Sequence, residues 1–231
     1  WSDQNRVLAG KHAAEPGRWR TSRTPYLREI MDHLSISSRT ERIVLMKGAQ
    51  IGATEVGNNW VGYVIHHAPG PMLYVEPTVD AAKKASRLRL APMIAESPAL
   101  TGLVVEAKTR YGSNTILQKE FPGGVLTITG ANSSVGLRHL ACRYLFADEV
   151  DGYPPDVGGE GDPLDLAIKR TETFGGTRKI FMTSTPTTKG FSRIETAYEE
   201  SDQRRYEIPC VHCGQFQTLE WGQIHWPDGH P

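Results

Sequence analysis

The sequence predicts an α/β fold with a mainly parallel central sheet flanked by helices. Short apolar runs, typical of buried parallel strands, alternate with helix-length segments along most of the 231 residues. One of these runs is followed by a glycine-containing loop and then by a helical segment, which is the order found in phosphate-binding loops. The composition, 39% hydrophobic and 23% charged, is that of an ordinary globular protein.

The individual elements follow from local patterns, taken in chain order. Residues 1–24 are polar and rich in arginine, so they predict an extended leading segment, and Pro25 suits the first position of the helix that follows. A proline and two glycines inside residues 114–130 predict a hairpin of two strands. The apolar runs predict strands at 42–47, 71–77, 143–149 and 178–186, and the segments between and after them predict helices at 54–67, 79–96, from 163 onward and at 192–202.

Composition and organisation exclude several classes. No apolar run approaches the roughly 18 residues of a membrane span, and the first residues lack the pattern of a secretory signal. Three cysteines, two of them closely spaced, suit a reducing compartment. A net charge of zero means that any contact with nucleic acid depends on local basic patches. The expected division is 1–40 as leading segment and first helix, 41–205 as the core domain, and 206–231 as a truncated segment.

The first candidate site is the stretch from Met46 to Thr54, MKGAQIGAT. Its glycines allow positive φ and close approach of backbone N–H groups to phosphate, and the following helix presents its positive end. The usual lysine position, however, holds Ala53, and the nearest lysine, Lys47, precedes the first glycine. The stretch is therefore either a chance turn or a variant phosphate loop. Its predicted ligands are Lys47, Gly48, Ala49, Gln50, Ile51, Gly52, Ala53 and Thr54.

Two further motifs fit the same chemistry. Asp148 and Glu149 end an apolar strand, as in a Walker B element, where the aspartate helps to hold Mg²⁺ and the glutamate polarises the attacking water. Thr54 occupies the position whose hydroxyl binds Mg²⁺. The strand at 178–186 ends in hydroxyl residues, and Thr183, Ser184 and Thr185 are candidates for sensing the γ-phosphate. The ordered set predicts a nucleotide hydrolase.

Two alternatives stay open at this point. The DEVD sequence that begins at Asp148 also fits a superfamily 2 helicase-like DNA translocase, although such proteins use the standard lysine position and a second motor lobe. A nucleic-acid-binding module with an inactive phosphate loop is the non-enzymatic alternative.

The ordered motifs resemble the large terminase subunit of tailed bacteriophages, in its lambda-like GpA branch. The segments that carry the resemblance are GRWRTSRTPYLREIMD, MKGAQIGATE, PGPMLYVEPTVDAAKKASRLRLAPMI, FPGGVLTITGANS, DEVDGYP, GEGDPLDLAIKRTETFG, STPTTKGFSRIE and PCVHCG. The resemblance implies a P-loop NTPase fold of the ASCE type, a three-layer sandwich. It also implies that the lysine of the phosphate loop is displaced upstream, so that Lys47 is the functional lysine.

The same resemblance implies a motor that uses ATP and Mg²⁺ to pump double-stranded DNA into a procapsid in the host cytoplasm. Its implied partners are the portal protein, the small terminase subunit and further copies in a homo-oligomeric ring. A nuclease domain is expected on the C-terminal side and is absent from these residues. By the same resemblance Tyr26 or Trp19 stacks on adenine, and Arg170, with Arg138 as second choice, acts on the ATP of a neighbouring subunit.

Cys210 and Cys213 form a C-x-x-C pair, the first half of a zinc ribbon. Two ligands do not hold zinc as four do, so Zn²⁺ is expected only in the full-length protein. Cys142, which precedes the Walker B strand, is expected to be a core thiol.

Overall fold

A central sheet organises the protein, whose computed structural model describes residues 1–10, 13–104, 115–138, 140–220, 222 and 225. Within these residues the main sheet has six strands in the order β3-β8-β7-β4-β6-β5. Neighbours are parallel except β5 and β6, which are antiparallel and form the predicted hairpin. The strands are β3 (Arg42–Met46), β4 (Met72–Glu76), β5 (Gln118–Phe121), β6 (Gly124–Gly130), β7 (Tyr144–Asp148) and β8 (Lys179–Ser184).

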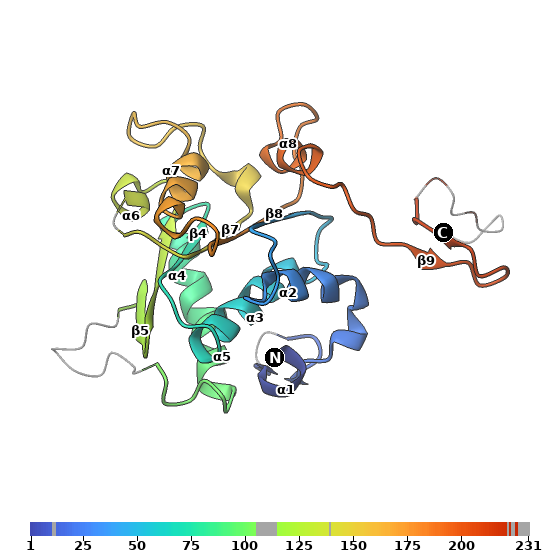
Figure 1. The fold of residues 1–231 in the computed structure, drawn as a ribbon, viewed down its shortest axis with the longest axis horizontal. Coiled ribbons are helices and arrows are strands. Elements are labelled where there is room, and N and C mark those ends of the chain that lie inside the picture. Colours follow the sequence, from blue (N-terminus) through green and yellow to red (C-terminus); the bar gives the residue numbers. More distant parts are fainter. Residues whose placement is uncertain (11–12, 105–114, 139, 221, 223–224, 226–231) are drawn as a thin grey trace.

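Helices cover both faces of this sheet, as Figure 1 shows. The helices α2 to α5 and the turn η3 lie on one face, and α6, α7 and α8 lie on the other. The α-helices are α1 (Ser2–Asn5), α2 (Arg28–Leu34), α3 (Ala53–His66), α4 (Val79–Ala85), α5 (Ala91–Glu96), α6 (Ser134–Arg138), α7 (Pro163–Lys169) and α8 (Arg193–Glu199). Short helical turns are η1 (Thr21–Arg23), η2 (Pro25–Leu27), the π-helical η3 (Ser86–Leu90), η4 (Val150–Gly152) and η5 (Glu172–Phe174). The expected three-layer α/β architecture is confirmed.

Alternation along the strands produces two cores. On the α3 face, Tyr74, Phe146 and Phe181 stack in a row across three strands, with ring centroids 4.4 and 5.3 Å apart. Gly57 of α3 lies directly over this row, because a Cβ atom there would come within 2.0 Å of the Phe146 ring. The residues that alternate with the row pack under α7 and α8. The sheet is therefore buried on both faces, which explains why its strands are continuous apolar runs.

The leading segment is folded rather than extended, which corrects the prediction for residues 1–24. It contains α1, η1 and a small antiparallel pair, β1 (Val7–Leu8) and β2 (Gly17–Arg18). Arg6 is only 3% exposed, and its guanidinium lies 2.7 Å from the Glu55 carboxylate and 3.1 Å from the Asn59 side-chain oxygen. This buried ion pair fastens the segment to α3, so its polar composition does not keep it in solvent.

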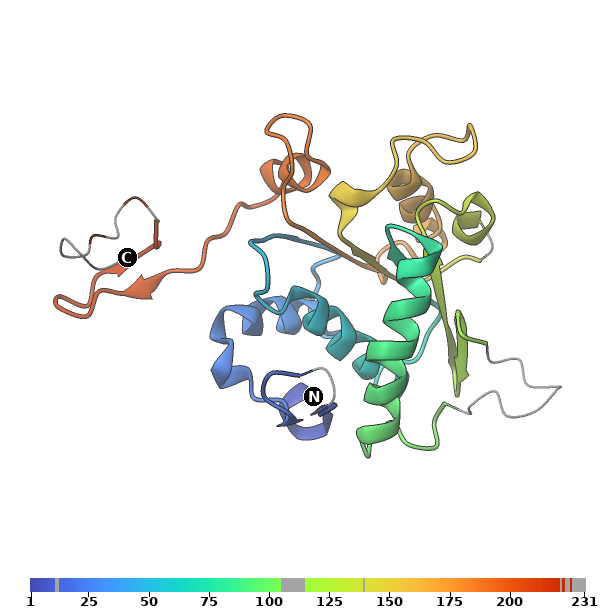
Figure 2. The ribbon, with the colours of Figure 1, turned by 180° about the vertical axis from the view of Figure 1, so that it is seen from behind.

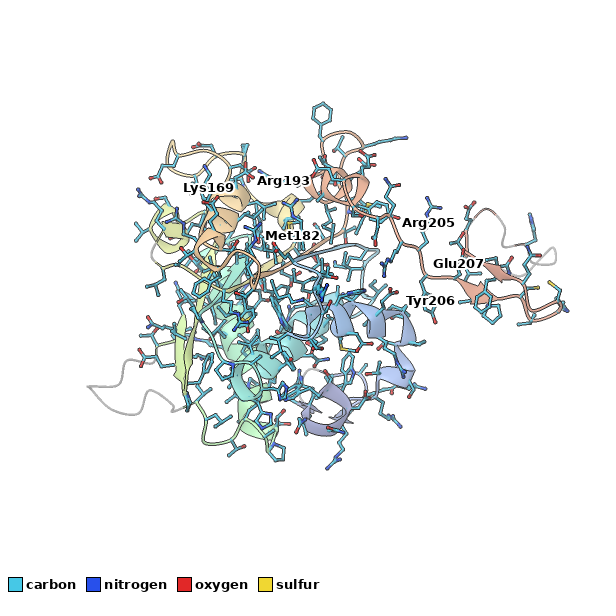
Figure 3. The ribbon with its side chains drawn as sticks, viewed as in Figure 1. Lys169, Met182, Arg193, Arg205, Tyr206 and Glu207 are labelled. Atoms are coloured by element: carbon cyan, nitrogen blue, oxygen red, sulfur yellow. The ribbon has the colours of Figure 1, made fainter. Side chains whose placement is uncertain are left out.

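Figure 2 shows α4, η3 and α5 as one continuous helix, which confirms the helix predicted at 79–96. Among the described residues, no helix combines the length and apolar character needed to cross a bilayer. Beyond α8, the stretch that carries Arg205, Tyr206 and Glu207 is extended and leads away from the sheet (Figure 3). It reaches a short hairpin of β9 (Ile208–Pro209) and β10 (Phe216–Gln217). The Tyr206 ring contacts the Tyr26 ring edge-on, with centroids 5.8 Å apart.

Candidate functional site

The loop between β3 and α3 lies at the carboxyl edge of the parallel strands. Gly52 caps α3 with a φ of 88°, and Gln50 also has a positive φ of 62°. Gly48, the other glycine of the loop that could adopt a positive φ, does not do so. Its surroundings are open, since a Cβ atom at this position would have no neighbour within 4 Å, so this glycine leaves room beside the backbone. The helix that follows has 14 residues, enough for a substantial positive end at the loop.

Lys47 directly follows β3, and its backbone N–H donates to the Ser184 carbonyl oxygen of β8 at 3.0 Å. Its side chain is 7% exposed and crosses the strand ends toward β7. The Nζ atom lies 2.6 Å from Glu149 Oε1 and 3.2 Å from Thr185 Oγ1. The three predicted motifs therefore meet at one amine, including the lysine that stands at the unusual position.

Asp148 is the buried carboxylate of the site, with 1% of its surface exposed. Burial raises its pKa to about 7, and the Glu76 carboxylate acts in the same direction, whereas a hydrogen bond with the Thr54 side chain opposes them. Its Oδ1 atom has no hydrogen-bond partner among the described residues. A buried carboxylate oxygen without a partner, next to a hydroxyl, fits Mg²⁺, which prefers oxygen ligands. Thr54 and Asp148 are therefore suited to hold this ion.

Glu149 follows in the left-handed region, with a φ of 52° and a ψ of 52°. This conformation is uncommon for a residue other than glycine and directs the side chain back over the strand ends. Ser184 Oγ lies 3.4 Å from Glu149 Oε2, and the Thr185 backbone N–H lies 3.5 Å from the same oxygen. Ser184 is 1% exposed. The hydroxyl residues at the end of β8 thus contact the carboxylate expected to orient water.

Of the two aromatic candidates for adenine, Tyr26 lies at the loop. Its hydroxyl donates to the Ile51 carbonyl oxygen at 3.1 Å. Trp19 is 7% exposed within the core, and its indole N–H donates to Thr21 Oγ1 at 3.0 Å. A buried ring has no free face for a base, so the structure argues against a stacking role for Trp19.

The two arginine candidates, Arg170 and Arg138, differ in their surroundings. Arg170 is half-buried near Cys142, which precedes β7, so it lies toward the opposite end of that strand from Asp148. Its Nε atom is buried and without a partner among the described residues. Arg138, at the end of α6, has a side chain 51% exposed that pairs with Glu160 at 2.8 Å. Of these two arginines, Arg138 has the more exposed side chain. Exposure therefore favours Arg138 over Arg170, the first choice, as the arginine that acts on a neighbouring subunit.

The cysteines occupy two different environments. Cys142 is 2% exposed and burial raises its pKa to about 12, which confirms the expected core thiol. Cys210 and Cys213 flank the turn between β9 and β10, and N–H groups of Cys213 and His212 lower the pKa of Cys210. Over the described ranges, no group of three or more His, Cys, Asp or Glu side chains is arranged to bind a metal ion.

Sequence reasoning did not single out Glu76, the last residue of β4. It is 7% exposed, and burial raises its pKa. The signal was the one that marked Asp148, an acid that ends an apolar run. The order of the strands, which the sequence does not reveal, places it beside Asp148.

The chain is similar in sequence to known proteins. The profile of the family described as "Phage terminase large subunit gpA, ATPase domain" matches residues 13–231. Two relatives, both described as "Terminase, large subunit", come from Enterobacteria phage P21 and Escherichia phage lambda. They are 30% and 29% identical over 231 residues, 99% of this chain. The chain spans 35% of the length of each.

Two solved structures are also similar in fold. The large terminase ATPase domain of Thermus phage P74-26 has a TM-score of 0.47 at 15% identity and covers 67% of this chain and 63% of its own. The large terminase of another thermophilic bacteriophage has a TM-score of 0.48 at 12% identity and covers 71% of this chain and 39% of its own.

Proposed function

The chain belongs to the family of phage terminase large subunits of the gpA type, as an ATPase domain, and from that premise we propose that it hydrolyses ATP with Mg²⁺ to drive double-stranded DNA into a procapsid. The observation that supports this most directly is the convergence of three strand ends on one amine. Lys47 Nζ contacts both Glu149 and Thr185, at 2.6 and 3.2 Å. Phosphate binding, water activation and coupling would therefore share one point.

The phosphates would lie over the loop 47–54, where backbone N–H groups and the N-terminus of α3 attract anions. In this proposal Lys47 leaves Glu149 and its amine moves onto the phosphates from the upstream end of the loop. The side chain starts from a strand end, so its anchor is already fixed by the bond to Ser184. Its upstream position is then compatible with the role that the standard lysine fills.

Thr54 and Asp148 are the residues proposed to hold Mg²⁺, since their oxygens adjoin and one lacks a partner among the described residues. The chemistry supplied by an ion at these two residues would be neutralisation of the negative charge that develops on the phosphates during phosphoryl transfer. Glu149, once released by Lys47, would orient the attacking water. Ser184 and Thr185 contact Glu149 and would report the state of the phosphates to β8.

Nucleotide recognition and assembly are parts of the same proposal. Tyr26 is the proposed adenine contact, because its hydroxyl already touches the loop at Ile51. Arg138 is the proposed arginine that acts on a neighbouring subunit in a ring, because its side chain is exposed whereas Arg170 is half-buried. Zinc would bind Cys210 and Cys213 only with further ligands from the rest of the protein.

The remaining partners rest on family membership alone. They are double-stranded DNA, the portal protein of the procapsid, the small terminase subunit and further copies of the same chain, with the host cytoplasm as the place of assembly. This chain spans 35% of the length of each curated relative. Activities of the relatives other than ATP hydrolysis are therefore not assigned to these 231 residues.

ATP turnover by the full-length protein tests the proposal. We expect Lys47→Ala and Glu149→Gln each to lower turnover at least about 100-fold, because each removes a group that acts on the reacting phosphate or water. Lys169→Ala is the control, since Lys169 is exposed on α7 (Figure 3). Turnover that survives Lys47→Ala, or a nucleotide complex in which another cation holds the phosphates, would refute the assignment of the lysine.

A further inference from the structure

Glu76 ends β4, in the middle of the sheet, and has no role in the proposed reaction so far. The register between β4 and β7 pairs Val75 with Ala147, so the next residues, Glu76 and Asp148, lie side by side at the carboxyl edge. Between β7 and β8 the register pairs Asp148 with Thr183. The three side chains therefore form a row across three adjacent strands.

All three point to the α3 face of the sheet. Each stands two residues beyond a member of the aromatic row formed by Tyr74, Phe146 and Phe181, and residues two apart in a strand share a face. Thr54 begins the first turn of α3 on that face and bonds to Asp148. The polar row thus lies directly beneath the proposed Mg²⁺ site.

The row contains buried polar atoms that lack partners. Asp148 and Thr183 are 1% and 0% exposed, and Asp148 Oδ1 and Thr183 Oγ1 make no hydrogen bond to any described residue. Glu76 differs because the Tyr74 hydroxyl donates to its Oε1 at 2.6 Å. That hydrogen bond fixes the orientation of the Glu76 carboxylate beside Asp148.

The row is also short of positive charge. Two carboxylates lie side by side at the ends of adjacent strands, and both are buried, with Glu76 7% and Asp148 1% exposed. Arg89 of η3 is the one cation whose charge acts on both within the described residues, and its side chain is exposed. Adjacent buried carboxylates are stable as anions only beside a cation or with a full set of hydrogen bonds. Partnerless oxygens together with excess negative charge call for a bound cation and its water.

We propose that Glu76 is a second acidic residue of the Mg²⁺ site, where its carboxylate accepts a hydrogen bond from a water on the ion held by Thr54 and Asp148. This inference rests on the proposed function. Glu76 is a positioning residue in this arrangement, since it acts on the ion through the water. Residues of this kind commonly change metal affinity about 10- to 100-fold when replaced.

Binding of Mn²⁺, followed by electron paramagnetic resonance with ADP present, tests the proposal on the full-length protein. Glu76→Gln keeps the size of the side chain and an acceptor for Tyr74. We expect it to weaken Mn²⁺ binding about 10- to 100-fold. ADP affinity in EDTA should stay at the wild-type value, which also shows that the variant is folded. Glu41→Gln, at the opposite end of the sheet, is the control and should bind Mn²⁺ like the wild type.

The outcomes separate the inference from the function on which it rests. Wild-type Mn²⁺ affinity in Glu76→Gln overturns the inference alone, even if turnover falls, because the residue would then act elsewhere than on the ion. A wild-type protein that binds no Mn²⁺ with ADP overturns the proposed function and the inference with it. A loss confined to Mn²⁺ binding, together with an unchanged affinity for ADP in EDTA, supports both.

Discussion

Replacing Glu149 with glutamine should tighten ATP binding while it stops hydrolysis. In the structure Lys47 is held by Glu149 at 2.6 Å, and this pair must separate before the amine can reach a phosphate. Glu149→Gln keeps the shape of the side chain but removes its negative charge. The lysine is then free to move at a smaller free-energy cost.

The exposed fractions of the two side chains set the size of the effect. The Lys47 side chain is 7% exposed and that of Glu149 is 42% exposed, so solvent screens the pair substantially. A half-exposed ion pair contributes about 1 kcal/mol. Relief of that interaction corresponds to about five-fold tighter binding. Loss of the group proposed to orient water should lower turnover about 10²- to 10⁴-fold.

Titration with a non-hydrolysable ATP analogue and Mg²⁺, alongside phosphate release, measures both effects. Glu41→Gln is a matched control, because its side chain is 41% exposed and pairs with Arg178 at 3.0 Å, at the far end of the sheet. The control should bind and hydrolyse ATP like the wild type. If Glu149→Gln binds the analogue no more tightly than the wild type, the lysine is not restrained by this carboxylate and the argument fails.

Three further predictions concern Lys179, Asp148 and the cysteines. Lys179 is 4% exposed, and its amine donates to three backbone carbonyl oxygens at 2.6–3.0 Å. Lys179→Met would leave these acceptors without their donor, so it should lower the free energy of unfolding by about 1–3 kcal/mol in urea denaturation. A variant as stable as the wild type would contradict this. Folding raises the pKa of Asp148 from 3.8 to about 7, so this residue stabilises the metal-free fold less as pH rises through 7. Relative to Asp148→Asn, the wild type should lose about 3 kcal/mol of stability between about pH 5 and pH 8, whereas parallel pH curves for the two proteins would disprove the shift. Iodoacetamide at about pH 8 should modify Cys210, whose pKa is lowered, well before Cys142, whose pKa is about 12, and mass spectrometry showing the reverse order would be decisive against it.

Much of the fold could be predicted because parallel strands buried on both faces must be apolar. Each of the four predicted parallel strands contains an observed strand that is one to three residues shorter; the predicted ranges were 42–47, 71–77, 143–149 and 178–186. Acids and hydroxyls that end such strands meet at one edge of the sheet, so the closeness of Lys47, Glu149 and Thr185 was implicit in the sequence. The ion pair of Lys47 with Glu149 could not be predicted, since it depends on the conformation of the lysine side chain.

The failures have physical causes as well. The polar, arginine-rich residues 1–24 predict an extended segment, but the ion pair of Arg6 with Glu55 holds this segment against α3, and the Trp19 indole lies in the core. Glu76 was overlooked because its importance depends on β4 lying next to β7, a long-range choice that local patterns do not contain.

The backbone bond between Lys47 and Ser184 has a kinetic consequence. A lysine on a loop moves only as fast as the loop does, often in nanoseconds to microseconds, whereas a lysine anchored at the end of a hydrogen-bonded strand needs only rotamer changes, which take picoseconds to nanoseconds when the side chain is free. Capture of an incoming phosphate would then require no rearrangement of the main chain. The same hydrogen bond joins β3, which leads to Lys47, directly to β8, which carries the hydroxyl residues. A displacement of either strand would therefore be transmitted directly to the other.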